Sequence, residues 1–278
     1  MAAGIRNITT TGQIGDGREA AAVDYVLAHA GAGNIDDVLA TIDKFAYEKS
    51  MLINVGDEKG TLLDAAVRRA DPALALELGT YLGYGALRIA RAAPEARVYS
   101  VELAEANASN ARRIWAHAGV DDRVVCVVGT IGDGGRTLDA LTEHGFATGT
   151  LDFVFLDHDK KAYLPDLQSI LDRGWLHPGS IVVADNVRVP GAPKYRAYMR
   201  RQQGMSWTPL STRRTSNTRP WCPTWYWSPN TWVSRRLVVD WSSRAVAVWL
   251  RMAVRPSRYG AAMHSLMYPS IDLDDAPM

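Results

Sequence analysis

Short apolar segments alternate with amphipathic segments through the middle of the chain, and this alternation restricts the possible fold more than any other feature. The apolar segments lie at residues 73–78, 97–101, 124–128, 151–156 and 180–184. Each is nearly continuous in its apolar character, which is typical of strands buried on both faces of a parallel sheet. The amphipathic segments lie at about 84–93, 104–118, 135–145, 161–174 and 193–203. Their spacing is that of right-handed crossover helices, so the sequence predicts a mostly parallel, doubly wound α/β sheet.

Three amphipathic helical patterns precede the predicted sheet. The first begins at Asp16 and ends at the glycines that follow residue 30, and the second begins after Asn34, a residue type that favours helix N-termini. The third covers about 58–70 and ends at the Asp-Pro pair that comes next. Residues 1–15 are small and polar without periodicity, so we expect this N-terminal segment to be disordered.

Composition excludes several classes of partner. The 31 basic and 30 acidic residues give a net charge of +1, which provides no electrostatic footprint for nucleic acid or an anionic membrane. Cys126 and Cys222 stand far apart and in no metal-ligand spacing, so we expect neither a disulfide framework nor a zinc site. No apolar run approaches the ~18 residues of a transmembrane helix, and no signal-peptide pattern is present. We expect a cytoplasmic, monomeric protein that acts on a small molecule.

The first two strands end in residues that suit a nucleoside cofactor. The first runs into the turn Glu77-Leu78-Gly79-Thr80-Tyr81-Leu82-Gly83-Tyr84, whose glycines allow a ligand to approach the backbone. The second ends at Glu102, where a carboxylate can accept hydrogen bonds from both ribose hydroxyls. A tight turn that binds nothing and a solvated strand-end carboxylate are the alternatives, but the two features together favour a cofactor site.

Oxygen-bearing side chains follow the fourth and fifth strands. Asp157 follows one strand and Asp185 and Asn186 follow the other, so all three should lie at one edge of the sheet. Carboxylate and amide oxygens, with room for water and a ligand oxygen, suit Mg²⁺. Lys160 comes three residues after Asp157, and its amine could act as a general base beside a metal. Helix capping with edge solvation, and a solvated lysine pair with Lys161, are the alternatives.

As a set, these residues resemble the catechol O-methyltransferase family over about residues 16–206. The spacing E-x-G-x-x-x-G in the first turn resembles the first motif of S-adenosylmethionine-dependent methyltransferases. The resemblance therefore implies a Rossmann-like class I methyltransferase fold. The motifs that carry it are Asn54-Val55-Gly56-Asp57-x-Lys59-Gly60, the turn from Glu77 to Tyr84, Phe155-Leu156-Asp157-His158-x-Lys160, and Ala184-Asp185-Asn186-Val187 followed by Pro190-Gly191-Ala192-Pro193.

The resemblance also implies a reaction and a role for each residue. The expected reaction is Mg²⁺-dependent transfer of a methyl group from S-adenosylmethionine to a hydroxyl of a catechol-type substrate. The alternatives are an O-methyltransferase for other vicinal-diol phenols of the caffeoyl or flavonoid type, and an inactive protein that binds S-adenosylmethionine. The implied cofactor contacts are Val55, Glu77, Gly79, Tyr81, Glu102 and Asp157, the metal ligands Asp157, Asp185 and Asn186, the catalytic base Lys160, and the substrate contacts Lys160, Asn186 and Pro190.

Several positions depart from the pattern of the family. Met51 and Asp159 stand where the family usually places Trp, and Gly85 stands where it commonly has a hydroxyl residue that touches the donor. Ile131-Gly132 replaces a Ser-Gln pair at the adenine edge. These differences concern donor affinity and phenol preference rather than the metal and base motifs.

The largest departure is the tail, residues 207–278. Residues 207–232 hold five Trp and several Arg but no Lys or acidic residue, and the final antiparallel hairpin of the family is missing. Back-translating residues 208–233 with a shift of one base gives strings that match the end of the family in order, so we expect a frame change near residue 207. The alternative is a genuine Trp-rich interaction segment. The frame change would leave the edge of the fifth strand unpaired and the tail disordered or non-native.

Overall fold

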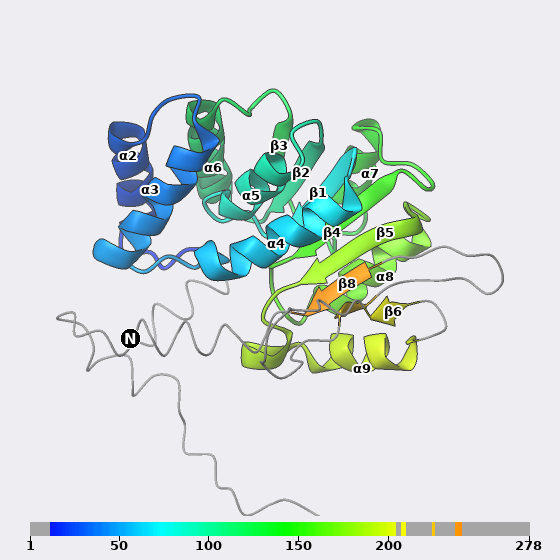
Figure 1. The fold of residues 1–278 in the computed structure, drawn as a ribbon. Helices are drawn as coiled ribbons and strands as arrows, with labels where there is room; N and C mark the ends of the chain where they lie inside the picture. Colours follow the sequence, from blue (N-terminus) through cyan, green and yellow to red (C-terminus); the bar gives the residue numbers. More distant parts are fainter. Residues whose placement is uncertain (1–11, 204–206, 210–223, 226–236, 241–278) are drawn as a thin grey trace, which may run out of the picture.

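A twisted, mainly parallel sheet forms the centre of the protein, as the computed structural model shows (Figure 1). The structure describes residues 12–203, 207–209, 224–225 and 237–240. The strands are β1 (Leu74–Leu78), β2 (Arg97–Glu102), β3 (Val124–Val128), β4 (Leu151–Leu156), β5 (Leu176–Ala184), β6 (Thr208–Pro209), β7 (Thr224–Trp225) and β8 (Leu237–Asp240). Their spatial order is β3-β2-β1-β4-β5-β8-β6, with β7 paired to β8.

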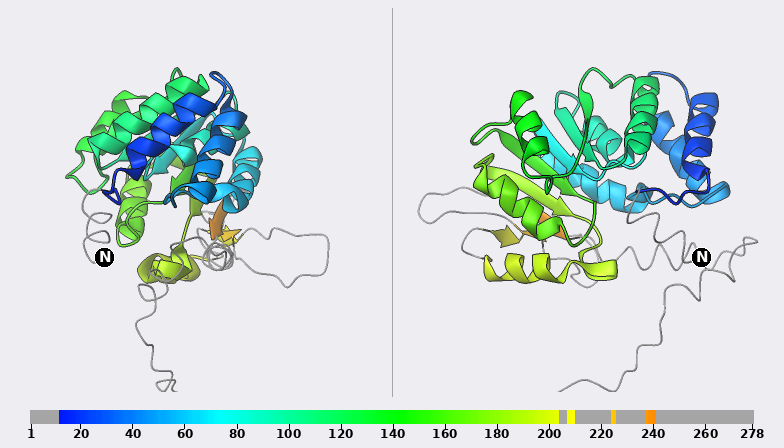
Figure 2. Two further views of the ribbon diagram at one scale, coloured as in Figure 1. Left: turned by 90° about the vertical axis from the view of Figure 1, so that its left-hand side faces the viewer. Right: turned by 180° about the vertical axis from the view of Figure 1, so that it is seen from behind.

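Helices cover both faces of this sheet (Figures 1 and 2). They are α2 (Arg18–His29), α3 (Ile35–Glu48), α4 (Gly56–Ala70), α5 (Tyr84–Ala92), α6 (Glu105–Ala118), α7 (Arg136–Glu143), α8 (Tyr163–Asp172) and α9 (Pro193–Arg201), with a π-helical turn at Val187–Gly191 before α9. The buried residues of α2 to α6 pack on one face, and those of α7 to α9 pack on the other. The predicted doubly wound fold is confirmed.

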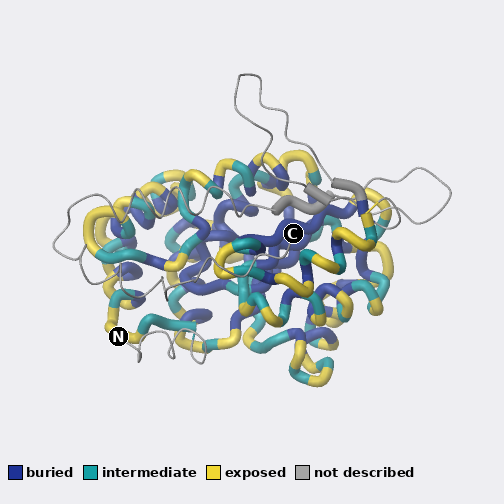
Figure 3. Tube along the Cα trace, turned by 90° about the horizontal axis from the view of Figure 1, so that it is seen from below, coloured by how far each residue is buried: buried dark blue, intermediate teal, exposed yellow. Residues whose placement is uncertain are grey.

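Strands β1 to β5 are parallel to their neighbours, and their side chains alternate between the two helix layers. Ala75 of β1 packs with α2 to α6, whereas Leu76 and Leu78 pack with α7 to α9. This alternation explains why the strands are almost continuously apolar in sequence, because both faces are buried. Figure 3 shows the buried segments running through the centre of the molecule and the exposed ones at its periphery.

The helix boundaries follow local signals. The Asn34 side chain accepts a hydrogen bond from the amide of Asp37 (3.1 Å), which confirms its role as the N-cap of α3. Helix α4 ends at Asp71, which takes a left-handed conformation (φ 45°) just before Pro72. It begins at Gly56, slightly before the predicted start at residue 58. Among the helices of the described residues, none combines the length and the hydropathy needed to span a membrane.

Residues 12–15, which belong to the N-terminal segment expected to be disordered, contact the folded domain. The amide side chain of Gln13 donates to Asn107 Oδ1 (2.9 Å), and the amide of Ile14 donates to Glu19 Oε1 (2.8 Å). Asn107 Nδ2 donates to the carbonyl of Gly12 (3.1 Å). The contacts of the chain with α2 and α6 thus begin before residue 16. Residues 1–11 lie outside the described part of the chain.

The edge of β5 that we expected to be unpaired is occupied by β8. Residues Ile181 to Ala184 pair in parallel with Leu237 to Asp240, so this expectation is wrong. An open strand edge presents unsatisfied backbone groups, and the β-branched segment Leu-Val-Val-Asp is well suited to pair with it. Strand β8 runs parallel to β5, unlike the antiparallel hairpin implied by the resemblance.

Trp207 belongs to the core rather than to a separate tail. Its side chain is fully buried with residues of α8 and α9, and its amide donates to the carbonyl of Gln202 (3.1 Å). The folded domain therefore extends at least one residue past the predicted boundary at 206. The tail residues 210–223, 226–236 and 241–278 lie outside the described residues, and so does the expectation that they are disordered or non-native.

A buried polar network joins α3, α4 and α5, which pack on the same face of the sheet. Arg88 donates from Nε and Nη2 to the two carboxylate oxygens of Asp64 (2.9 and 2.7 Å), and Arg91 also contacts Asp64. Arg88 Nη1 donates to the hydroxyl of Tyr84, which donates to Asp43 Oδ2 (2.9 Å). A bidentate pair with both partners buried holds the helices in one orientation, because either charge alone would be costly to bury.

Gly60 leaves room for this network. A Cβ atom at residue 60 would lie 2.5 Å from the guanidinium carbon of Arg88, which is closer than any real contact. The glycine in the motif that begins at Asn54 therefore has a packing role: it lets Arg88 pass between α4 and α5 to reach Asp64. The sequence patterns do not indicate this buried pair.

We predict that Asp43→Asn stabilises the protein at neutral pH but not at pH 4. Burial raises the pKa of Asp43 from 3.8 to about 6, although the hydrogen bond from Tyr84 opposes the shift. Folding therefore favours the protonated form of Asp43. The free energy that this form contributes to folding is lost as the pH rises from about 4 through 6. Asn keeps an acceptor for Tyr84 and cannot ionise. Urea unfolding at pH 7.5 should show a gain of about 1 kcal/mol, and a gain of equal size at pH 4 would contradict this explanation.

Candidate active site

The carboxyl ends of β1 and β4 meet through a glycine. Gly79 takes a left-handed conformation (φ 98°), and a Cβ atom there would lie 2.5 Å from the carbonyl oxygen of Asp157 and 2.8 Å from its carbon. Only glycine allows both the backbone conformation and this close approach. The turn after β1 therefore lies directly against Asp157, so the predicted cofactor loop and the first predicted metal ligand belong to one site.

Glu102 at the end of β2 holds the same turn in place. Its Oε2 accepts hydrogen bonds from the backbone amides of Thr80 (3.1 Å) and Tyr81 (2.9 Å), and its Oε1 accepts from Ala104 N (2.9 Å) and Asn107 Nδ2 (3.3 Å). The residue is almost completely buried. Because Tyr81 has a positive φ of 51°, the carboxylate compensates a backbone conformation that a non-glycine residue rarely adopts. The structure thus brings Gly79, Tyr81 and Glu102 together, and their contact with a cofactor stays a prediction.

The N-terminal segment lies over this carboxylate. A Cβ atom at Gly12 would lie 3.3 Å from Glu102 Oε1 and 3.0 Å from Asn107 Nδ2. Glu19 of α2 accepts from the hydroxyl of Tyr81 (3.1 Å), which links α2 to the turn after β1. These contacts form one wall of the candidate cofactor region. The sequence patterns do not indicate this wall.

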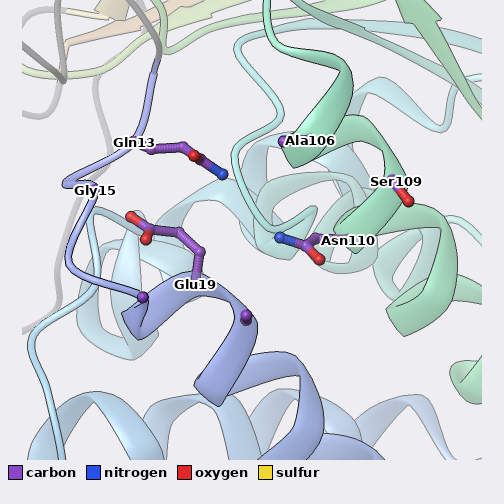
Figure 4. Close-up of a pocket in the computed structure, with 8 residues that line it drawn as sticks. Gln13, Gly15, Glu19, Ala106, Ser109 and Asn110 are labelled. Atoms are coloured by element: carbon purple, nitrogen blue, oxygen red, sulfur yellow. The ribbon is translucent and has the colours of Figure 1, made fainter.

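A cavity of about 460 Å³ lies between the N-terminal segment and α6. In Figure 4, the side chain of Gln13 points toward α6, where Ala106, Ser109 and Asn110 are found, whereas the carboxylate of Glu19 points back toward the N-terminal segment at Gly15. The cavity adjoins the candidate site through two of its lining residues: Glu19 contacts Tyr81, and Gln13 contacts Asn107, which contacts Glu102. The residues that line it are Gln13, Gly15, Gly17, Glu19, Ala20, Ala106, Ser109 and Asn110.

Glu77 lies beneath the turn rather than at its surface. The residue is 1% exposed, and its carboxyl group accepts a hydrogen bond from the hydroxyl of Ser100. Burial raises the pKa of Glu77 well above its usual value, and the nearby Asp157 and Glu102 carboxylates add to this while Ser100 opposes it. Burial therefore disfavours the ionised form of Glu77. Its contact with a methyl donor stays a prediction.

The glycine at position 85 makes room for Glu77. A Cβ atom at residue 85 would lie 2.1 Å from Glu77 Oε1 and 3.2 Å from the ring of Phe155. The space that a hydroxyl side chain would occupy is thus filled by the carboxyl group of Glu77. The buried position of Glu77 therefore explains why residue 85 is glycine in this chain, where the resemblance led us to expect a hydroxyl residue.

Asp157 and Asp185 lie side by side after β4 and β5. Leu156 and Ala184 are partners in the parallel register, and the amide of Asp185 donates to the carbonyl of Leu156 (2.9 Å). Burial and the proximity of Asp185 raise the pKa of Asp157, whereas Lys160 and Lys59 lower it. The two carboxylates therefore repel each other across a short distance and are compensated by cationic side chains.

Asn186 completes the predicted trio. It has a positive φ of 56°, its amide nitrogen Nδ2 donates to the carbonyl of Val189 (3.1 Å), and its backbone amide donates to Asp185 Oδ1 (2.7 Å). The side-chain oxygen is thereby left as an acceptor. Within the described part of the chain, His, Cys, Asp and Glu alone form no cluster of three, so the third ligand would be this amide. Two carboxylates and one amide oxygen fit a hard divalent cation such as Mg²⁺.

Lys160 is fixed beside Asp157 by two polar partners. Its Nζ donates to Asp157 Oδ1 (3.1 Å) and to the hydroxyl of Tyr163 (2.7 Å). That hydroxyl lies within hydrogen-bond distance of the carbonyls of Leu156 (2.7 Å) and Asp185 (3.0 Å). Burial raises the pKa of Tyr163, so the hydroxyl stays protonated and remains a donor. Tyr163 thus joins the lysine to the ends of both strands.

Lys59 and Tyr163 are the site residues that the sequence analysis did not assign. Lys59, on α4, forms a salt bridge with Asp185, and both side chains are largely buried. Both residues stand in or next to quoted motifs: Lys59 follows Val55 by four residues, and Tyr163 follows Lys160 by three. This closeness in sequence to the quoted motifs is a signal that could have suggested them.

Val55 and Pro190, the remaining predicted residues, differ in their exposure to solvent. Val55 is buried just before α4, the helix whose Lys59 reaches Asp185. Pro190 is exposed in the turn after Asn186, and it follows a cis peptide bond with Val189. The structure thus gathers the predicted residues of the last strand ends at one edge and leaves Pro190 accessible from solvent.

The fold and the site together define a Rossmann-like class I methyltransferase architecture. The family model described as O-methyltransferase matches residues 32–200, which includes β1 to β5 and every predicted site residue. This chain belongs to the O-methyltransferase family.

Individual relatives support the same assignment. A probable O-methyltransferase of Mycobacterium tuberculosis is 99% identical over 210 residues, which are 76% of this chain and 90% of that protein. A catechol O-methyltransferase of Bos taurus is 38% identical over 197 residues, or 70% of each chain. The solved structure of the O-methyltransferase TomG of Streptomyces achromogenes, in complex with S-adenosylmethionine, has a TM-score of 0.50 and 26% identity, covering 63% of this chain and 82% of that one.

We predict that Gly79→Ala is far more destabilising than a glycine substitution at another left-handed position. The new Cβ would collide with the backbone of Asp157, which cannot move like a flexible side chain. Urea unfolding should show a loss of about 3 kcal/mol or more. The matched control is Gly33→Ala, at φ 74° with no atom within 4 Å of the new Cβ, which should lose about 1 kcal/mol. Equal losses would show that the contact with Asp157 is unimportant.

Proposed function

We propose that this O-methyltransferase transfers a methyl group from S-adenosylmethionine to a hydroxyl of a catechol-type substrate in the presence of Mg²⁺. The observation that carries the proposal is the convergence of Asp157, Asp185, Asn186 and Lys160 beside the turn at Gly79. The 38% identity to bovine catechol O-methyltransferase supports the substrate class, and the TomG complex supports the donor.

The turn after β1 and the end of β2 would form the donor site. Glu102 accepts from Thr80 and Tyr81 at Oε2 and from Ala104 and Asn107 at Oε1, so a ribose hydroxyl would replace the longest of these hydrogen bonds, the one from Asn107 (3.3 Å). Gly79 lets the donor approach the backbone near Asp157. Val55, Tyr81 and Glu77 would complete the donor contacts, with Glu77 acting from below the turn. The sulfonium of the donor would then lie close to the metal edge.

Asp157, Asp185 and Asn186 would hold the metal and position the acceptor. When bound, Mg²⁺ would bring two adjacent hydroxyl oxygens of the substrate together and lower their pKa. The protein residues would supply three oxygen ligands and leave further positions for the two substrate oxygens. Asn186 comes directly before the turn Val187–Gly191, and Pro190 lies within it. Both residues would limit where the aromatic ring of the substrate can lie.

Lys160 would move the proton. Its Nζ, held by Asp157 and Tyr163, would accept the proton of the reacting hydroxyl after losing one of its own to solvent. The phenolate oxygen then forms a bond to the methyl carbon while the bond from that carbon to sulfur breaks. The products are the methyl ether and S-adenosylhomocysteine, and no protein nucleophile takes part. Orienting two bound reactants would provide much of the rate enhancement.

Two alternatives to this function remain: methylation of other vicinal-diol phenols, and binding of S-adenosylmethionine without methyl transfer. Met51 and Asp159, which replace Trp residues expected from the resemblance, favour an acceptor pocket different from that of mammalian enzymes. Other vicinal-diol phenols of the caffeoyl or flavonoid type therefore form the second candidate substrate class. A panel of such diols, compared with catechol by kcat/KM, separates these classes, whereas donor binding without turnover would indicate the inactive alternative.

We also propose that the chain after about residue 207 results from a one-base frame change. Residues 208–233 yield family-like strings when shifted by one base, and the strong match to the Mycobacterium tuberculosis relative extends over 210 of the 278 residues. In this proposal, β8 substitutes for the missing hairpin by pairing with β5 in the opposite sense.

We predict that methyl transfer to catechol requires both the metal and Lys160. Labelled S-adenosylmethionine should give labelled product with Mg²⁺, and a chelator should abolish it. Lys160→Met should lower kcat by about 10²-fold or more, since it removes the proton acceptor. Binding of S-adenosylmethionine, measured by calorimetry, should change little in that variant. Product formation that is insensitive to chelator would contradict the proposed role of the carboxylates.

We predict that restoring the shifted frame raises both stability and turnover. The restored chain should gain a native final hairpin on the edge of β5, so its melting temperature and its kcat should exceed those of the chain as given. Affinity for S-adenosylmethionine serves as the control, because the proposed donor residues lie before residue 160 in both proteins. A restored chain that is neither more stable nor more active would refute the frame proposal.

A further inference from the structure

Lys59 enters the candidate metal site from a distant part of the sequence. Its Nζ forms a salt bridge with Asp185 Oδ2, although the two residues are 126 positions apart. The lysine side chain is 11% exposed and that of Asp185 is 2% exposed, so solvent screens this pair little. The neighbouring carboxylate, Asp157, follows the strand paired with β5 and is bound by Lys160 (3.1 Å).

The charges of the site already balance without a metal. Asp157 and Asp185 contribute two negative charges, and Lys59 and Lys160 contribute two positive ones. A divalent cation bound between the carboxylates would therefore bring an excess charge of two into a poorly screened region. The same ammonium that relieves repulsion between the carboxylates in the metal-free protein must repel the incoming cation.

We propose that Lys59 sets the metal affinity of this site: it stabilises the metal-free carboxylate pair and weakens binding of the divalent cation. The inference rests on the proposed metal-dependent function. Lys160 has a different proposed role, because its amine is also hydrogen-bonded to Tyr163 (2.7 Å) and is the proposed proton acceptor. Lys59 contacts Asp185, which makes it the group that competes for this ligand.

A purely structural salt bridge would behave differently. Removing a structural lysine lowers stability and damages the site, so metal binding should weaken or stay unchanged. Removing a competing lysine lowers the stability of the metal-free protein but strengthens metal binding. The two roles therefore predict opposite changes in metal affinity, and this difference can be measured without any methyl transfer.

The test is calorimetric titration of MgCl₂ into the full chain without donor or substrate, paired with melting temperatures with and without the metal. Lys59→Met keeps the apolar stem and removes the charge; we expect Mg²⁺ to bind about tenfold tighter or more. The melting temperature should be lower than that of the unaltered protein without Mg²⁺, and the increase caused by Mg²⁺ should be larger. Lys59→Arg keeps the charge and should bind Mg²⁺ like the unaltered protein.

Lys161→Met is the matched control, because it removes a lysine charge near the site at an exposed position. Screening by solvent should leave its Mg²⁺ affinity within about twofold of that of the unaltered protein. If Lys59→Met does not fold, Lys59→Gln retains a donor for Asp185 without the charge and should show the same gain.

Each outcome decides between the proposals. Mg²⁺ affinity that is unchanged or weaker in the Lys59 variants, while the unaltered protein binds measurably, would overturn the role of Lys59 alone. Binding that becomes detectable only after Lys59 is replaced would support it. Absence of Mg²⁺ binding in the unaltered protein and in every Lys59 variant would overturn both this inference and the metal-dependent function.

Discussion

The contact between Gly79 and the backbone of Asp157 is the constraint on which the rest of the site depends. It lets the turn after β1 lie against the end of β4, where any larger residue would collide with the carbonyl of Asp157. Glu102 accepts a hydrogen bond from the amide of Tyr81 in this turn. Asp157 accepts one from Lys160 and lies beside Asp185 at the end of the neighbouring strand. The proposed donor region and the proposed metal region thus become neighbours because one position has no side chain.

Four carboxyl groups crowd the same edge of the sheet, and each is accommodated in a different way. Glu102 accepts backbone amides, and Glu77 is favoured in its neutral form by burial. Asp157 and Asp185 are paired with lysines from opposite sides. Hydrogen bonding, burial in the less ionised form and pairing with lysines each limit the repulsion among the four groups, so an edge rich in acidic residues can remain folded.

Sequence patterns were least informative where distant residues compensate one another. From the sequence, Gly85 indicates the loss of a hydroxyl contact with the methyl donor. In the structure, the carboxyl group of Glu77 fills the space that a side chain at residue 85 would occupy. Lys59 and Tyr163 carried no assigned role because their partners, Asp185 and the strand-end carbonyls, become neighbours only after folding. The edge of β5 was expected to be open, but a segment more than fifty residues further along the chain pairs with it.

The sequence by itself determined the parallel doubly wound sheet, the family, and the placement of Gly79, Glu102, Asp157, Asp185 and Asn186 at one edge. It could do so because residues that end adjacent parallel strands must meet, and the strands are legible as buried apolar runs. Only the tertiary structure decided how the charges are shared among Asp157, Asp185, Lys59 and Lys160, and that residues 12–15 lie over Glu102. Those features depend on distances between groups far apart in the chain, which no local pattern encodes.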